Sequence, residues 1–136
     1  MRIDQAALLC LALLFLAGCR NPYIMEQRFE ESFREHNRML RWQELEQSCM
    51  TFAAVEVKDA CLERAKAAKG VSVADFRVME TELDSKKGTA RVRLEIDYFI
   101  LPAPRLKTIQ DVQKWRHVPD EGLGRWYLET PPPEFR

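Results

Sequence analysis

Hydrophobic and polar side chains repeat with two different periods along the chain, first that of a helix and then that of a strand. Residues 23–69 contain neither proline nor glycine, and their apolar side chains return every three or four positions, as on one helical face. A second apolar set, Trp42, Leu45 and Cys49, is offset from the first, which indicates a break near Leu40–Trp42. The first set is Met25, Phe29, Phe33, His36 and Leu40.

The last part of this helical region carries small side chains on one face, which permits close packing against a neighbouring element. Gly70 follows this face and is suited to end a helix in the left-handed conformation. We therefore expect three helices within residues 23–69. The small face contains Ala54, Val57, Cys61, Ala65 and Ala68.

Beyond Gly70 the alternation has a period of two, which is that of a half-buried strand. Residues 90–100 show it most clearly, because their even-numbered positions are apolar and most of their odd-numbered positions are charged. Pro102 and Pro104 end this strand, since proline cannot continue a central ladder. Helices followed by antiparallel strands are typical of an α+β domain with the helices on one face of the sheet. The pattern predicts four strands, at residues 71–83, 90–100, 106–118 and 125–129.

The composition is that of one folded domain. The chain has 136 residues, which is enough for a single core. Charged residues make up 31% and hydrophobic residues 46%, a balance typical of globular rather than disordered proteins. Because the 21 basic and 21 acidic side chains cancel, the composition argues against a nucleic-acid partner, which requires an excess of positive charge.

An uncharged apolar run occupies residues 6–19. It is shorter than the ~20 apolar residues of a membrane-spanning helix and is typical of a signal peptide, which we place at residues 1–18. The run ends in Leu16-Ala17-Gly18-Cys19, which resembles the lipobox of bacterial lipoproteins. That resemblance implies that a diacylglyceryl group is joined to the Cys19 thiol through a thioether, and that Cys19 becomes the first mature residue. The alternatives are plain secretion and an uncleaved anchor.

The anchor predicts where the protein resides. Two or three acyl chains hold a protein at a membrane effectively permanently. Arg20 stands where aspartate resembles an inner-membrane retention signal, so we expect the outer membrane, with the domain facing the periplasm. A tether at residues 19–22 spans about 10 Å at ~3.5 Å per residue, which holds the domain at residues 23–129 against the membrane. We expect the proline-rich tail at residues 130–136 to be disordered, the alternative being that it docks in a groove of a partner protein.

Two cysteines remain after Cys10 leaves with the signal peptide and Cys19 carries lipid. An even pair in an oxidising compartment favours a disulfide between Cys49 and Cys61. On one straight helix they would lie about 18 Å apart, so a disulfide requires a bend near Met50–Phe52. The alternative is two buried free thiols. The chain has no CxxC or HxxxH spacing, and we expect neither a metal nor a cofactor.

Aromatic residues are concentrated in the expected closing strands. Asp97-Tyr98-Phe99, followed by residues 111–115 and 124–128, resembles the closing strands of the nuclear transport factor 2-like superfamily. Gln113 with Trp115, and Gly124 with Trp126 and Leu128, match the "QxW … GxWxL" pair of that superfamily. The likeness, with its order of helices and strands, covers about residues 22–129. It implies a cone in which a curved, mainly antiparallel four-stranded sheet and the first helix enclose a pocket. Members include isomerases, dehydratases, cyclases and transport adaptors, so the fold does not specify one function.

The residues that could line such a pocket support two readings. As an isomerase- or dehydratase-type enzyme, the protein would use Asp111 as base and His36 or a tyrosine as donor on a small hydrophobic substrate. In the alternative interpretation these residues only stabilise the fold. Asp111 then pairs with an arginine on a neighbouring strand, His36 is a hydrogen-bonded core histidine and the tryptophans fill the core. We favour a non-enzymatic periplasmic lipoprotein that binds an envelope partner or a small apolar ligand. The pocket candidates are His36, Trp42, Tyr98, Asp111 and Trp115.

Overall fold

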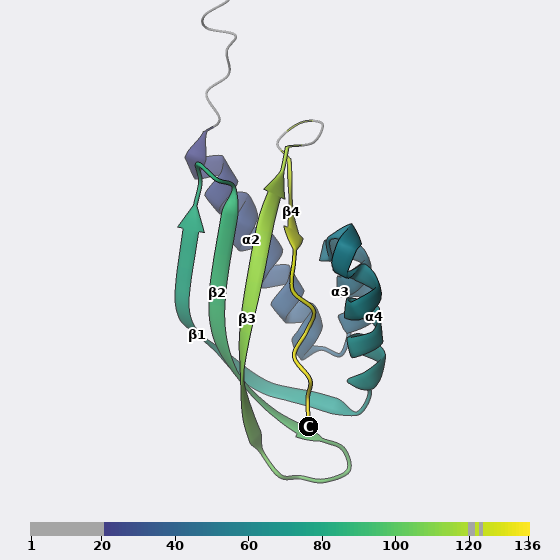
Figure 1. Cartoon of the computed structure of the whole chain (residues 1–136). Coiled ribbons are helices and arrows are strands. Elements are labelled where there is room, and N and C mark those ends of the chain that lie inside the picture. Colours follow the sequence, from purple (N-terminus) through teal and green to yellow (C-terminus); the bar gives the residue numbers. More distant parts are fainter. Residues whose placement is uncertain (1–20, 120–121, 123) are drawn as a thin grey trace, which may run out of the picture.

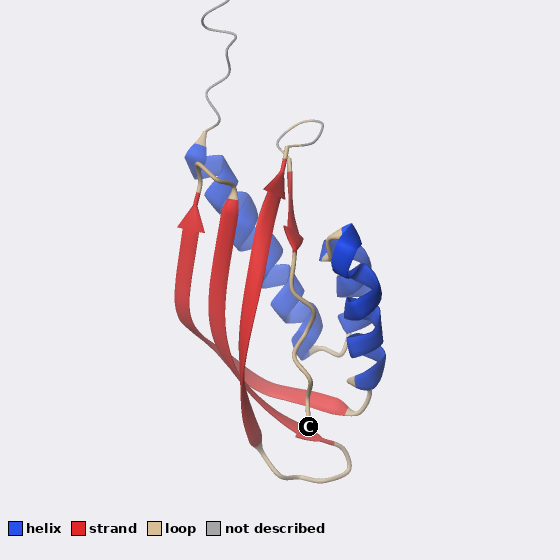
Figure 2. Ribbon diagram, viewed as in Figure 1, coloured by secondary structure: helices blue, strands red, loops and turns tan. Residues whose placement is uncertain are grey.

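The computed structural model describes residues 21–119, 122 and 124–136. In this part of the chain three α-helices and a short 3-10 helix precede four strands (Figure 1). The elements are α2 (Pro22–Arg41), α3 (Leu45–Phe52), η1 (Val55–Val57), α4 (Lys58–Ala67), β1 (Val71–Asp84), β2 (Thr89–Ile100), β3 (Lys107–Val118) and β4 (Arg125–Leu128). The predicted α+β class is confirmed, and the helices lie on one side of the sheet (Figure 2).

The predicted signal peptide and lipid-bearing Cys19 lie outside the described residues. Within the described ranges, no helix is both long enough and apolar enough to cross a bilayer.

The sheet is antiparallel throughout, with the strand order β1-β2-β3-β4. Two register shifts, between Val73 and Asp75 and between Val78 and Glu80, each place one extra residue in β1. Such bulges bend a strand and increase its twist. Figure 1 shows the result, because β1 starts beneath α4 and then turns upward beside β2.

Helix α2 begins and ends where its sequence indicates. The Asn21 side chain accepts a hydrogen bond from the backbone N–H of Tyr23 at 3.1 Å, and Pro22 occupies the first turn, where it needs no backbone donor. The helix ends at Arg41, as the offset apolar pattern predicts. The next turn places Gln43 at a φ of 63°, which redirects the chain into α3.

This redirection overturns the expectation that Trp42 fills the core or lines a pocket. Trp42 is the residue just after α2 and before α3, and it is 65% exposed. Its ring lies 6.0 Å from the guanidinium carbon of Arg41. Because the helix stops one residue earlier, residue 42 belongs to the packed face of neither helix.

Aromatic rings fill the space between α2 and the sheet. The ring of Phe29 on α2 packs edge-on against Trp115 of β3 and Trp126 of β4, with centroid distances of 6.0 and 5.1 Å. The Trp126 indole N–H donates to the backbone carbonyl of Met25 at 3.0 Å. The rings therefore fill the space between α2 and these strands, where the sequence resemblance implies a pocket.

The expected disorder of the tail is wrong. Residues 130–136 run along the molecule beside α4 (Figure 1), where Arg64 donates a hydrogen bond to the Pro132 carbonyl at 2.9 Å. The ring of Phe135 packs edge-on against Tyr98 at 4.9 Å, and the Tyr98 hydroxyl donates to the Arg136 carbonyl at 2.8 Å. Prolines lose little conformational freedom on ordering, so these few contacts hold the tail in place.

Candidate functional site

A buried polar network joins α2 to the inner face of β3. The side chains of Asn37 and Gln113 hydrogen-bond each other, with Gln113 Nε2 donating to Asn37 Oδ1 at 2.9 Å. Asn37 Nδ2 also donates to the Phe33 carbonyl at 2.8 Å, and Trp115 Nε1 donates to Gln113 Oε1 at 3.3 Å. No buried side-chain nitrogen or oxygen in the described residues lacks a partner. This network fixes α2 on the sheet and leaves no free donor for a ligand.

Asp111 lies next to this network. The expected ion pair between Asp111 and an arginine on a neighbouring strand is absent from the described residues. Asp111 is 9% exposed. Its neighbour across the β2–β3 ladder is the apolar Leu94, while the β2 arginines point to the other face. Burial raises the pKa of Asp111 to about 6, although a hydrogen bond from Gln113 acts in the opposite direction.

His36 is a hydrogen-bonded core histidine, as its position on an apolar helix face indicates. It is 3% exposed, and its Nδ1 lies 2.6 Å from the hydroxyl of Ser48 on α3. The rings of Phe52 and Trp115 pack edge-on against it, at 6.3 and 5.6 Å. Burial lowers the pKa of His36 to about 4, so the imidazole is neutral at pH 7.

The structure therefore gives different hydrogen-bond partners to the two groups that an enzyme of this class would combine. His36 bonds to Ser48, Asp111 interacts with Gln113, and no hydrogen bond joins His36 to Asp111. Tyr98 is also buried, and its hydroxyl is occupied by the tail at Arg136. Four of the five pocket candidates are thus core residues, and Trp42 lies at the surface.

Acidification is expected to act on His36 and Asp111 in opposite directions. The pKa of His36 is about 4 in the fold and about 6.5 when unfolded. Between these values only the unfolded chain binds the proton, so His36 lowers stability as the pH falls. The pKa of Asp111 is about 6 in the fold and about 3.9 when unfolded. Between these values the folded chain binds the proton first, so Asp111 raises stability as the pH falls.

The contributions of His36 and Asp111 to the free energy of unfolding oppose each other between about pH 6 and pH 4. In Asp111→Asn the contribution of Asp111 is removed, so the pH dependence caused by His36 should become visible. Relative to the wild type, this variant is expected to lose up to about 1.4 kcal/mol of stability per pH unit on acidification. His36→Gln should show the opposite slope. Urea unfolding at intervals from pH 6.5 to 4 measures both. Parallel curves for Asp111→Asn and the wild type would contradict a buried carboxyl with a raised pKa.

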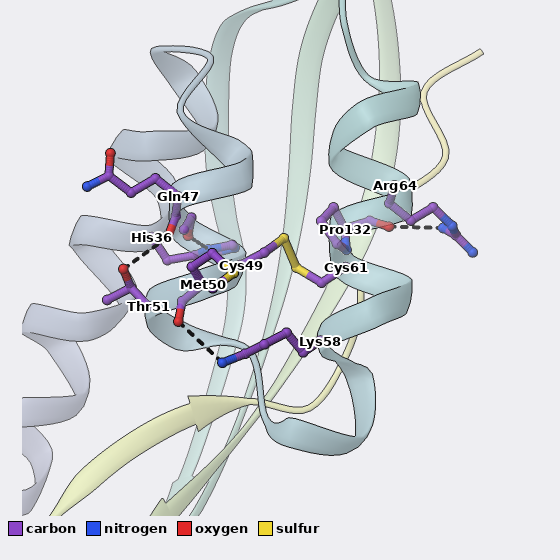
Figure 3. Close-up of a disulfide and its surroundings, with 10 residues drawn as sticks. His36, Gln47, Cys49, Met50, Thr51, Lys58, Cys61, Arg64 and Pro132 are labelled. Carbon is purple, nitrogen blue, oxygen red and sulfur yellow. Dashed lines mark hydrogen bonds between the residues drawn. A yellow bond between two sulfur atoms is a disulfide. The ribbon is translucent and has the colours of Figure 1, made fainter.

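A disulfide joins α3 to α4. Cys49 and Cys61 are bonded, with their Cα atoms 5.7 Å apart (Figure 3). The bend that a disulfide requires is present, since α3 ends at Phe52 and η1 reverses the chain before α4 begins. Lys58 Nζ reinforces this corner with a hydrogen bond to the Met50 carbonyl at 3.4 Å. The disulfide is structural, because both cysteines lie in the core.

An apolar cleft, the α2–β1 cleft, opens between the first turns of α2 and the inner face of β1. Its volume is about 420 Å³. Glu26, Glu30 and Arg34 from α2 are the charged residues at its rim. The walls are formed by Phe29, Phe33, Phe76, Val78, Thr81, Leu83 and Val92.

Sequence reasoning missed this cleft. The bulges at Ala74 and Met79 interrupt the period-two pattern of β1, so the inner face of this strand cannot be followed by alternation alone. The register with β2 shows that face, because Phe76 lies opposite Ile96 and Val78 lies opposite Leu94. A phenylalanine pair on α2 facing an interrupted strand is the only signal that the sequence offers.

A second cleft, of about 380 Å³, lies where the end of α2, the start of α3 and the end of α4 meet the tail. Polar side chains such as Gln43, Glu44, Gln47 and Lys69 line much of it, and Phe135 of the tail forms part of its wall. Sites for small molecules are lined mainly by apolar side chains. The α2–β1 cleft fits that description better.

Comparison with known protein families finds no match, and comparison with curated proteins finds no similar sequence.

Proposed function

We propose that this chain is a lipid-anchored protein of the bacterial envelope whose domain binds a partner protein or a small apolar ligand in the α2–β1 cleft. The observation that carries the proposal is the place of this cleft relative to the lipobox. Helix α2 begins at Pro22, three positions after Cys19, and residues 26–34 of its first turns form one wall of the cleft.

The length of the tether limits the distance between the lipid anchor and the cleft. Residues 19–21 span about 10 Å at ~3.5 Å per residue, and the helix from Pro22 to Arg34 rises about 18 Å at 1.5 Å per residue. With the anchor in a bilayer, the cleft lies within about 30 Å of the membrane. The domain would then face components of the same membrane, on the periplasmic side of the outer membrane.

The surroundings of the two candidate catalytic residues, Asp111 and His36, favour a binding function over catalysis. A general base must reach both a bound substrate and its proton-transfer partner. Asp111 is buried and interacts with Gln113, and His36 is enclosed by Ser48 and two aromatic rings. Neither side chain lines the α2–β1 cleft, so neither can act as the acid or the base of an isomerase-type reaction there.

We also propose that the domain has a nuclear transport factor 2-like fold in which the interior is filled. Three helices ahead of a strongly bent antiparallel sheet support this assignment (Figure 1). The aromatic motif residues give further support, because Gln113, Trp115, Trp126 and Leu128 are all buried on the inner face of neighbouring strands. The rings of Trp115 and Trp126 then occupy the position of the pocket.

Replacing Cys19 by alanine is expected to abolish lipid attachment. In cells fed an alkyne analogue of palmitate, the wild-type protein should carry the label and Cys19→Ala should carry none. Cys10→Ala is the matched control, because Cys10 lies in the predicted signal peptide and should leave labelling unchanged. Mass spectrometry of the N-terminal peptide gives the mass of the attached group. An unlabelled wild-type protein, or a labelled Cys19→Ala variant, would overturn the lipid anchor.

A further inference from the structure

Strand β1 is an open edge of the sheet. It pairs with β2 on one side, and no other strand in the described residues adjoins it (Figure 1). The opposite edge is partly covered, because the Ala54 N–H donates to the Leu128 carbonyl of β4 at 2.8 Å and Ala53 forms a parallel bridge with Leu128. An edge strand presents a row of unpaired backbone N–H and C=O groups, which can bind another strand.

The usable part of this edge lies beside the α2–β1 cleft. The register shift between Val78 and Glu80 marks a bulge, and from Glu80 to Asp84 the pairing with β2 continues without interruption. In this stretch Thr81 and Leu83 line the cleft, while Glu80 and Glu82 lie on the other face. A strand added here would therefore insert every second side chain into the cleft.

Strand β2 already pairs with β1, and its residues show which side chains fit opposite residues 80–82 of β1. Arg93 of β2 lies opposite Glu80 and forms an ion pair with it at 3.5 Å, and Arg91 lies opposite Glu82. Between them, Val92 lies opposite Thr81 and is fully buried. The complement of β1 is thus basic on the outer face and apolar on the inner face.

The negative charge at the rim of the cleft also favours a partner strand with basic side chains. Glu82 forms no ion pair with any described residue, and Glu26 and Glu30 of α2 add negative charge at the rim of the cleft. Arg34 is the only cation among the residues that line it. Opposite charges directly across neighbouring strands stabilise pairing, whereas like charges oppose it.

We propose that residues 80–84 of β1 bind an extended segment of a partner protein, in which lysine or arginine alternates with apolar residues, by strand addition. Backbone hydrogen bonds to the open edge supply affinity, and the apolar side chains enter the α2–β1 cleft, which is the general mode of β-augmentation. This inference rests on the proposed function and identifies the occupant of the cleft as a protein strand.

A peptide with the sequence of residues 89–95, Thr-Ala-Arg-Val-Arg-Leu-Glu, is a direct probe. Labelled with fluorescein, it is expected to bind the folded protein in an anisotropy titration. A matched peptide with both arginines replaced by glutamate should bind at least about tenfold more weakly, since a tenfold change corresponds to about 1.4 kcal/mol. Binding of the basic peptide should weaken with added salt. Equal binding of the two peptides, or no binding of the basic one, overturns strand addition.

Two neighbouring residues provide matched variants of the protein. Val78 and Met79 are each 47% exposed, but Val78 lines the cleft and Met79, the bulge residue, does not. Val78→Lys is expected to weaken peptide binding at least about tenfold, and Met79→Lys should leave it within about twofold. Circular dichroism establishes that both variants remain folded. An equal loss in both variants overturns the proposed position of the strand.

The apolar dye N-phenyl-1-naphthylamine separates failure of this inference from failure of the proposed function. The dye becomes fluorescent in an apolar site and needs no strand edge, and Phe33→Lys should reduce its signal because Phe33 forms a wall of the cleft. If the dye binds in this Phe33-dependent way and the peptide does not, strand addition is overturned and binding in the cleft stands. If neither binds, both strand addition and binding in the α2–β1 cleft are overturned, while the lipid anchor is tested separately by the labelling of Cys19.

Discussion

Replacement of Trp115 by alanine is expected to lower the free energy of unfolding by about 3–5 kcal/mol. The indole is 1% exposed and packs edge-on against Phe29, His36 and Phe52, with centroid distances of 6.0, 5.6 and 6.0 Å. It also donates to Gln113, so its removal leaves both a cavity and a weakened polar network. Urea unfolding followed by far-ultraviolet circular dichroism measures the loss.

Trp42→Ala is the matched control, because it removes the same ring from an exposed position. It should change the free energy of unfolding by no more than about 0.5 kcal/mol. A loss for Trp115→Ala as small as that expected for Trp42→Ala would show that Trp115 does not support the core.

Loss of the Cys49–Cys61 disulfide is expected to lower the free energy of unfolding by about 2–4 kcal/mol. The two cysteines are separated by 12 positions, and a cross-link over a loop of this size restricts the unfolded chain by about 3 kcal/mol in the chain-entropy model. The disulfide also holds α3 against α4, so its loss removes a constraint on the folded corner. The double variant Cys49→Ala/Cys61→Ala avoids burying a new hydroxyl group at either position.

Reductant provides an independent measurement of the same quantity. Dithiothreitol should destabilise the wild-type protein by about as much as the double variant is destabilised, and it should have no effect on that variant. Both are compared by urea unfolding at one pH. A wild-type protein whose unfolding is insensitive to reductant would contradict a structural role for this bond.

Local sequence patterns predicted the elements because a helical or strand period repeats within a few residues. The break after Leu40 and the strand at residues 90–100 both agree with the structure, in which α2 ends at Arg41 and β2 spans Thr89–Ile100. The inner face of β2 was predicted in the same way, because alternate side chains of a strand point to opposite faces. These predictions needed no knowledge of what packs against each element.

The predictions that were wrong concern residues whose surroundings depend on distant parts of the chain. Trp42 is exposed because the turn at Gln43 directs α3 away from it. The tail is ordered because Arg64 and Tyr98 lie where it passes. Asp111 has no arginine because the arginines of β2 are on the other face of the sheet. Composition and periodicity carry no information about such neighbours.

By itself the sequence determined the type and order of the elements and the inner face of the regular strands, because adjacent residues carry that signal. Only the tertiary structure decided that Gln113 meets Asn37, 76 positions away, that Cys49 meets Cys61, and that rings fill the interior. It also decided that α2 and the bulged β1 leave an apolar cleft between them. Such contacts depend on how whole elements pack, since each one joins side chains that no local pattern relates.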